Sequence, residues 1–431
     1  MNSVTPGLAL LLVVASLAPT PAAAADAPAD RPRPLAKLAG PAGTAVAFSQ
    51  DGKLILTAGS DEARVWDAGT FEPLTLALKH DAPVEAAAFS PDGAMLVTCA
   101  GTKAIAWDTR TGFRLHALDH PDRVPEAAFS PDARVVCTAC LDGSARLWDV
   151  ATGRPRAELK HGQPVRSVSF SRDGGRLLTG SLVSANDRRL DDWDKRNAGD
   201  THDPFAPGLA HVWGVARREE LCVLPMGRGW CRGRPAFSPD GARVAVPCGL
   251  DGADLCDIES GNDVAAWRGV CGMEGITIVG FDGGGRHLLL AGDDGADDVD
   301  HALHVMEVVP DERFGIPGHW WPNRFKRVLG LLPLHSIDAA AISPDGTTVA
   351  ATFRDLHFTG RGDRDILGVW DVATGRQLLE VPTRTYPDTI RRRPSALSFS
   401  PDGRRVAAGF APDGYTAVWE VPGGTSRQTP P

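Results

Sequence analysis

Residues 129–149 read Phe-Ser-Pro-Asp-Ala-Arg-Val-Val-Cys-Thr-Ala-Cys-Leu-Asp-Gly-Ser-Ala-Arg-Leu-Trp-Asp. The stretch opens with a turn phrase, Phe-Ser-Pro-Asp, and closes with a second phrase, Arg-Leu-Trp-Asp. Apolar-rich runs stand on both sides of the turn phrase, as in Val165–Phe170 before one copy and Val135–Thr138 after another. Two such runs separated by turn residues predict a strand, a tight hairpin and a second strand.

The turn phrase recurs along the whole chain. Its copies begin at Phe48, Phe89, Phe129, Phe170, Phe237, Phe281, Ile342 and Phe399. The first four copies are 40 or 41 residues apart, and the later gaps are 67, 44, 61 and 57 residues. In the compact units the Trp phrase follows 18 to 20 residues after the Phe. A short turn and a fourth apolar run come next, so each unit predicts a four-stranded antiparallel blade.

A blade cannot bury both of its faces alone, so the units are expected to stack around one axis. The stretch 34–39 resembles a fourth strand, whereas the chain ends after a third strand at 416–421. The N-terminal strand should therefore complete the last blade and remove its open edge. We predict an all-β fold, a single closed propeller of eight blades; seven blades is the alternative if unit five or six is too degenerate.

At these residues the chain resembles the WD40-repeat β-propeller family, over roughly residues 34–422. The resemblance implies a structural hydrogen-bond set of His, Ser or Thr, Asp and Trp. The third unit carries the full set: His120, Thr138, Asp142 and Trp148. Units five and six depart from the pattern, because Cys256 and Val305 stand where Trp is expected.

The two ends of the chain are expected to lie outside the propeller. Residues 8–17 form an apolar run broken only by Ser16, which is too short to span a bilayer, and Ala23-Ala24-Ala25 follows. We interpret residues 1–25 as a signal peptide, with a disordered Ala/Pro leader as the alternative, 26–33 as a linker and 423–431 as a disordered tail. The expected product is an exported bacterial protein, periplasmic or secreted, that does not span a membrane.

Composition bounds the function. Of the 431 residues 43% are apolar and 23% are charged, which excludes disorder along most of the chain. The net charge of −9 does not favour binding to nucleic acid. GxSxG, HExxH and P-loop patterns are absent from the sequence, and the pair Cys137 and Cys140 lacks the following His of a haem motif. We therefore expect a monomer without a cofactor, and not an enzyme.

Cysteine and aspartate clusters give two weaker hypotheses. Five of the eight Cys surround unit five, and Cys231 and Cys248 are expected at the same end of that blade, where a disulfide could replace the missing hydrogen-bond set. The acidic run at 293–300 could offer oxygen ligands to calcium, although a solvated loop is the favoured interpretation. Its carboxylates are Asp293, Asp294, Asp297, Asp298 and Asp300.

Insertions give the best functional clue. The long loops are expected at 182–208, 293–301, 309–336, 354–367 and 383–394. In a propeller of this family they would share one face, and insertions gathered on one face often mark the binding face. Trp and Arg are favoured interface anchors. The candidate partner-binding residues are Trp320, Trp321, Arg324, Phe325, Arg327, Arg384, Tyr386, Arg391, Arg392 and Arg393.

The favoured function is a non-catalytic, extracytoplasmic scaffold for protein–protein interaction, with partners that the sequence does not name. Two alternatives stay open: a propeller that binds a small ligand, a glycan or calcium, and an enzyme with its site in the central funnel. An enzyme would need titratable groups that converge in that funnel. The aromatic residues of the loops could instead pack against the rim.

Overall fold

The computed structural model describes residues 32–41, 44–182, 208–226, 234–247, 252–260, 263–268, 276–292, 303–308, 325–331, 335–355, 364–385, 394–410 and 415–423. The chain divides into two compact units, residues 1–32 and 33–431. Every strand belongs to the second unit, and the described residues contain no helix. The predicted signal peptide, nearly all of the linker and nearly all of the tail lie outside the described residues.

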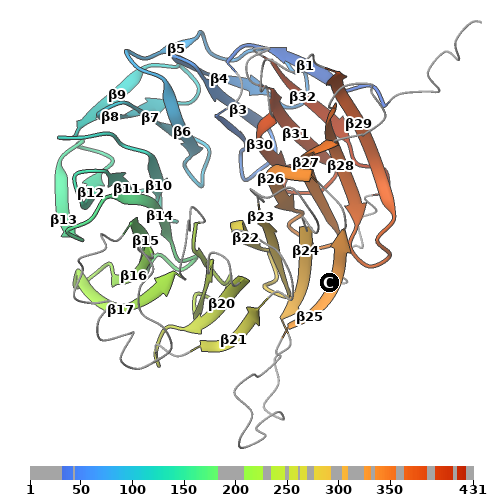
Figure 1. Ribbon diagram of the computed structural model, residues 1–431. Helices are drawn as coiled ribbons and strands as arrows, with labels where there is room; N and C mark the ends of the chain where they lie inside the picture. Colours follow the sequence, from blue (N-terminus) through green and yellow to red (C-terminus); the bar gives the residue numbers. More distant parts are fainter. Residues whose placement is uncertain are drawn as a thin grey trace, which may run out of the picture. The chain divides into compact units, whose positions relative to one another are not determined.

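The strands form eight four-stranded antiparallel sheets (Figure 1). This confirms the prediction of eight blades and excludes the alternative of seven. Blades 1 and 2 contain β2 (Ala45–Phe48), β3 (Leu54–Gly59), β4 (Glu62–Asp67), β5 (Leu78–Lys79), β6 (Val84–Phe89), β7 (Met95–Ala100), β8 (Lys103–Asp108) and β9 (Arg114–Asp119). Blades 3 and 4 contain β10 (Glu126–Phe129), β11 (Val135–Cys140), β12 (Ser144–Asp149), β13 (Pro155–Lys160), β14 (Val165–Phe170), β15 (Arg176–Leu182), β16 (Gly208–Gly214) and β17 (Glu219–Met226).

The second half of the ring repeats the same order. Blades 5 and 6 contain β18 (Ala236–Phe237), β19 (Arg243–Pro247), β20 (Gly252–Asp257), β21 (Asp263–Arg268), β22 (Ile276–Phe281), β23 (His287–Gly292), β24 (Leu303–Val308) and β25 (Phe325–Leu331). Blades 7 and 8 contain β26 (His335–Ile342), β27 (Thr348–Asp355), β28 (Arg364–Asp371), β29 (Gln377–Thr385), β30 (Pro394–Phe399), β31 (Arg405–Phe410), β32 (Tyr415–Glu420) and β1 (Ala36–Ala39).

The ring closes through the N-terminal strand, as predicted. The last sheet has the order β1-β32-β31-β30, and Ala36 pairs with Val418 while Ala39 pairs with Tyr415. The first strands of the last and first blades, β30 and β2, also contact each other. Closure satisfies the edge of β32, which would otherwise expose a row of unpaired backbone groups.

One apolar cluster fills each of the eight interfaces between neighbouring blades. Between blades 2 and 3, for example, Val97 and Leu118 pack against Val136 and Trp148. The Trp of each consensus blade faces the preceding blade, as Trp66 of blade 1 does toward blade 8. Since a blade has two apolar faces, this stacking buries both of them, which is the physical reason for the ring.

The register corrects the alignment of unit six. In the regular blades the Phe of the turn phrase pairs through the second strand to the Trp, as in Phe129↔Val136↔Trp148. In blade 6 the corresponding path ends on Met306, not on Val305. Met306 also packs toward the preceding blade, whereas Val305 packs toward the following one. The assignment of Val305 was therefore wrong, because a shift of one residue moves a strand residue to the other face.

Three of the predicted loops are shorter than expected. Strand β25 lies within the predicted loop 309–336, β27 and β28 extend into 354–367, and β29 extends into 383–394. Phe325, Arg327 and Arg384 are therefore strand residues, with Arg327 paired to Met306 and Arg384 paired to Asp365.

Candidate functional site

The two rims of the ring differ in what their connections carry. Because the strands of a blade are antiparallel, the hairpins between strands one and two share a rim with the turns between strands three and four. We call this the hairpin rim. The loops between strands two and three, and the connections between blades, lie on the other rim, which we call the insertion rim. Strands β15 and β16 of blade 4 and strands β27 and β28 of blade 7 end at this rim on either side of residues 183–207 and 356–363, which lie outside the described residues.

Polar groups of the hairpin rim are engaged within their own turns. In blade 3, Ser130 Oγ donates a hydrogen bond to Asp132 Oδ1 at 2.6 Å and accepts one from the Val135 amide at 2.9 Å. Ala133 takes a positive φ of 57° where most copies place Gly. The hydrogen bond from Ser130 holds the pKa of Asp132 below its usual value. The same Ser–Asp hydrogen bond closes the hairpin between strands one and two in blades 1, 2, 4, 5, 7 and 8.

The second turn of this rim is closed in the same way. Asp149 accepts hydrogen bonds from the Thr152 amide and the Thr152 hydroxyl, both at 2.9 Å, and pairs with Arg156. These contacts, Arg156 first, lower the pKa of Asp149 to about 2. Equivalent Asp–Thr turns end the third strands of blades 1, 2 and 7. The hairpin rim is therefore built from short, internally bonded turns.

Ion pairs lie on the inner side of the insertion rim, where the first strands begin. Arg123, in the connection to blade 3, donates from Nε to Glu85 Oε1 of blade 2 at 3.0 Å. Glu126 begins β10 and accepts from Arg234 Nη1 of blade 5 at 2.6 Å and from the Val168 amide of blade 4 at 3.2 Å. Burial raises the pKa of Glu126, and Arg234 opposes that shift. Glu126 therefore links three blades beside the ring axis.

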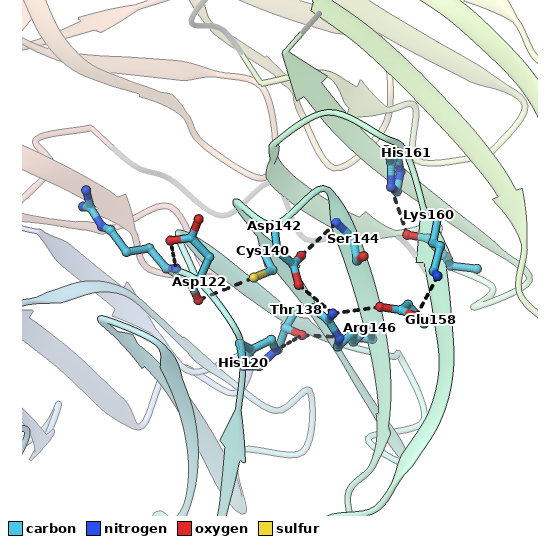
Figure 2. Close-up of polar contacts among 12 residues, drawn as sticks. His120, Asp122, Thr138, Cys140, Asp142, Ser144, Arg146, Glu158, Lys160 and His161 are labelled. Carbon is cyan, nitrogen blue, oxygen red and sulfur yellow. Dashed lines mark hydrogen bonds and ion pairs between the residues drawn. The ribbon is translucent and has the colours of Figure 1, made fainter.

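The predicted hydrogen-bond set of blade 3 forms a chain that Figure 2 shows in part. Trp148 Nε1 donates to Thr138 Oγ1 at 2.9 Å, and His120 Nε2 lies 2.8 Å from the same oxygen. His120 Nδ1 donates to the Leu118 carbonyl at 2.8 Å, so Nε2 of the neutral ring accepts the Thr138 hydroxyl. Burial lowers the pKa of His120 to about 4, which keeps the ring neutral near pH 7.

Asp142 belongs to a neighbouring network and does not bond to His120. Its Oδ1 accepts from the Ser144 amide at 3.0 Å, and its Oδ2 pairs with Arg146 Nη2 at 2.6 Å. The same guanidinium nitrogen reaches Glu158 at 2.7 Å (Figure 2). The structure thus joins three of the four predicted residues, because His120 and Trp148 both bond to the Thr138 hydroxyl. It places Asp142 in an ion-pair network beside them.

Blade 4 repeats the His–Thr–Trp set and adds a second network, built on His211, which sequence reasoning missed. His161 Nε2 lies 2.7 Å from Thr179 Oγ1, to which Trp213 donates at 3.0 Å. Beside this set, His211 Nε2 lies 3.2 Å from Ser181 Oγ, and His211 Nδ1 donates to Glu220 at 2.5 Å. Both His211 and Ser181 are buried. Ser181 lies near the end of β15 and His211 in the middle of β16, so their contact joins the two strands between which residues 183–207 are inserted.

Most of the predicted binding residues fall outside the described residues. These are Trp320, Trp321, Arg324, Tyr386, Arg391, Arg392 and Arg393. The calcium candidates Asp293, Asp294, Asp297, Asp298 and Asp300 also lie outside, as do Cys231 and Cys248. Of the described cysteines, Cys99, Cys137, Cys140 and Cys222 are free thiols. The described residues contain no cluster of metal-ligating side chains and no helix long and apolar enough to cross a membrane.

The axis-side ion pairs were also absent from the sequence predictions. Glu126 and Arg234 are 108 positions apart, and no repeat position marks either of them as paired. A usable signal was the register: a charged residue at the start of a first strand lies next to the axis. Glu85 in β6 and Glu126 in β10 satisfy that rule.

Comparison with known proteins agrees with this geometry. The family model of the WD domain, G-beta repeat, matches residues 33–67, 72–108, 112–149 and 153–190, which run from β1 to β15. No curated protein matches the chain in sequence.

Two solved structures share the fold. One is the β-propeller domain of Myceliophteria thermophila Cps50 (Swd1), with 15% identity and a TM-score of 0.55 over 90% of this chain and 99% of that one. The other is the C-terminal WD40 domain of Sif2, with 14% identity and a TM-score of 0.66 over 91% of this chain and 99% of that one. The chain therefore carries four matches to the WD repeat in its first half and folds as a closed β-propeller of eight blades.

Proposed function

We propose that the chain is a non-catalytic, extracytoplasmic scaffold that binds protein partners through its insertion rim. Propellers of the WD40 type generally serve as protein-interaction scaffolds. The observation that carries the proposal is the contrast between the rims. The hairpin rim engages its polar groups in short turns, whereas the strands that flank residues 183–207 and 356–363 end at the other rim. A propeller whose additions gather on one rim is expected to bind there.

The framework beneath the insertion rim supports this proposal. Glu126 ties blades 3, 4 and 5 together, and Glu85 and Arg123 tie blades 2 and 3. These pairs rest on strands that the ring already fixes in place, so charge is held in a constant arrangement around the axis. A rigid base of this kind reduces the ordering cost of binding a partner.

The binding test uses partners captured by the wild-type chain from an envelope extract and then purified. Replacing Trp320, Trp321 and Arg391 to Arg393 by Ala should weaken their binding about tenfold or more, since Trp and Arg dominate interface energies. Arg404→Ala, in a hairpin-rim turn of blade 8, is the matched control and should leave the affinity unchanged. Equal affinity for all variants, with unchanged melting temperature, would place the interface elsewhere.

Export has its own measurement. The mature chain is isolated from a producing bacterium, and its N-terminus is sequenced. Cleavage after Ala25 and recovery from the periplasm or the medium support the extracytoplasmic part of the proposal. An intact N-terminus in the cytoplasmic fraction contradicts that part. The binding test of the insertion rim does not depend on this result.

A further inference from the structure

We infer that the outer edge of blades 1 and 2 is a docking surface for an anionic lipid surface. Leu74, Leu76, Phe113 and Leu115 form what we call the apolar edge patch. Their exposed fractions are 47, 90, 72 and 42%, and they are four of the six large apolar side chains that the described residues expose. The inference goes beyond the proposed function, because the patch does not lie on the insertion rim.

Contacts between turns and neighbouring strands bring the blade 1 and blade 2 parts of the patch to one edge of the ring. A Cβ added at Gly112 would meet Thr75 and Leu78 at 3.4 and 3.3 Å, so the turn before Phe113 lies against the outer segment of blade 1. A Cβ at Gly153 would likewise meet the ring of His116, so the next turn lies against β9. Figure 1 shows β5, β9 and β13 following one another along the outer edge.

A local irregularity exposes the blade 1 side chains. Only two residues form β5, because the segment before it leaves the ladder after the bridge between Trp66 and Pro73. Thr75 Oγ1 takes over as acceptor for the Val65 amide at 3.1 Å. Thr75 is consequently buried while Leu74 and Leu76 on either side of it point outward. Burying the Thr hydroxyl instead of a Leu is unfavourable for folding alone and favours an external apolar partner.

The repeat supplies an internal comparison for Phe113. Its place in the turn between strands three and four is held by Arg154 in blade 3 and by Arg376 in blade 7. Arg is well suited to such an exposed site, so the fold does not require an aromatic ring there. A Phe that is 72% exposed at this position is explained by contact with something outside the ring.

The charge around the patch identifies the occupant. Arg110, Arg114 and Arg154 are exposed beside it, and Arg114 and Arg154 make no ion pair among the described residues. The Asp108 carboxylate accepts a hydrogen bond from the Thr111 hydroxyl, so Glu72 is the exposed carboxylate near the apolar residues that lacks such a bond among the described residues. Projecting Leu and Phe side chains flanked by guanidinium groups suit the boundary between acyl chains and phosphate headgroups. Docking by the outer edge would leave the insertion rim uncovered.

Vesicle flotation tests the inference with the full chain. Vesicles of phosphatidylcholine containing about 30% phosphatidylglycerol should bind the wild-type chain, and binding should fall at high salt. Phe113→Ser combined with Leu76→Ser, which removes apolar area without changing the charge, should reduce binding about tenfold or more. These variants keep the same residues 1–31, so the difference reports on the patch. Leu221→Ser, on the outer strand of blade 4, is the matched control and should bind like wild type.

Two outcomes would overturn the inference. One is equal flotation of wild type and the Leu76/Phe113 variant, with both folded by thermal melting. The other is loss of a captured protein partner in that variant without any vesicle binding by wild type, which would assign the patch to a protein. Arg114→Glu with Arg154→Glu adds a readout of charge: it should abolish the salt dependence, and an unchanged salt dependence contradicts the role of the guanidinium groups.

Discussion

Blades 1 to 4 and blades 5 to 8 have the same topology but different interiors. In blades 1 to 4 a Thr hydroxyl accepts the indole N–H of the blade's Trp, at Thr57, Thr98, Thr138 and Thr179. In blades 5 to 8 the register places Val246, Leu290, Ala351 and Ala408 at the same position. The family model matches only the first half.

The difference between the halves separates the features that suffice to form a blade from the hydrogen bond that adds to its stability. Both halves keep the apolar interfaces, as the clusters between blades 5 and 6 and between blades 7 and 8 show. In blade 8 the indole nitrogen of Trp419 is buried without a hydrogen bond to the protein. Apolar alternation and the hairpin therefore suffice for the blade, and the Thr–Trp bond is an addition that the first half retains.

The largest expected effect comes from breaking the junction between the two halves. Deleting residues 26–40 removes β1 and exposes the edge of β32. Each lost ladder bond costs about 0.5–1.5 kcal/mol net, and the buried Leu38 adds an apolar term. We expect a strongly lowered melting temperature or aggregation, measured by calorimetry and light scattering. A monomer with an unchanged melting temperature would contradict closure by β1.

A second prediction compares two buried Thr residues. Thr138→Val keeps the shape but removes the partner of His120 and of Trp148, which should cost about 2–5 kcal/mol in unfolding free energy. Thr416→Val in blade 8 is the control, because the Thr416 hydroxyl makes no hydrogen bond with the protein. It should change stability by less than about 1 kcal/mol. Similar losses at both sites would show that the hydrogen-bond set is not what distinguishes the halves.

Acid should weaken the first half through its buried histidines. Burial lowers the pKa of His120 to about 4 and also lowers that of His80. As pH falls below the ordinary value near 6.5, the unfolded chain takes up a proton that the folded ring does not, so stability declines until about pH 4. His120 alone contributes up to about 3 kcal/mol over that range. Urea unfolding at several pH values measures the decline.

The control for the acid effect is His120→Gln, which cannot titrate. Its unfolding free energy should depend less steeply on pH between about 6.5 and 4 than that of the wild type. A slope identical to that of the wild type would mean that other groups dominate acid sensitivity.

The smallest effect is a gain. Ala408→Thr places a hydroxyl in blade 8 at the position that Thr138 holds in blade 3, within reach of the unpaired Trp419 indole. A new buried hydrogen bond should raise stability by about 0.5–1.5 kcal/mol. A lower melting temperature would show that the space around Ala408 has adapted to the missing hydroxyl.

Much of the ring could be predicted because its rules are local. The turn phrases, the period and the unpaired fourth strand at residues 34–39 predict blades and closure, and the structure confirms them. The Trp positions of the consensus blades follow from the same pattern. Blade 6 is the exception: its third strand, Leu303–Val308, has no Trp to mark the register, so the sequence pointed to Val305 instead of Met306.

The candidate site was less predictable. The alternation of loop lengths predicts which rim carries the insertions, because antiparallel strands must return to alternate ends. The contacts beneath that rim are tertiary. His211 meets Ser181 across neighbouring strands, and Leu76 becomes exposed through a hydroxyl that replaces a ladder bond. Neither event has a periodic signature.

The sequence by itself determined the kind of blade and the strand that closes the ring, because repeated apolar runs and turns act within about 40 residues. It favoured eight blades but left seven open, and the structure decided for eight. Only the tertiary structure decided which charges meet. Glu126 accepts a hydrogen bond from Arg234, 108 positions away, because the first strands of blades 3 and 5 both lie beside the axis of the ring. The exposure of Phe113 beside Thr75 likewise depends on one blade lying against the next. Pairings of this kind follow from the curvature of the ring, which a linear pattern does not contain.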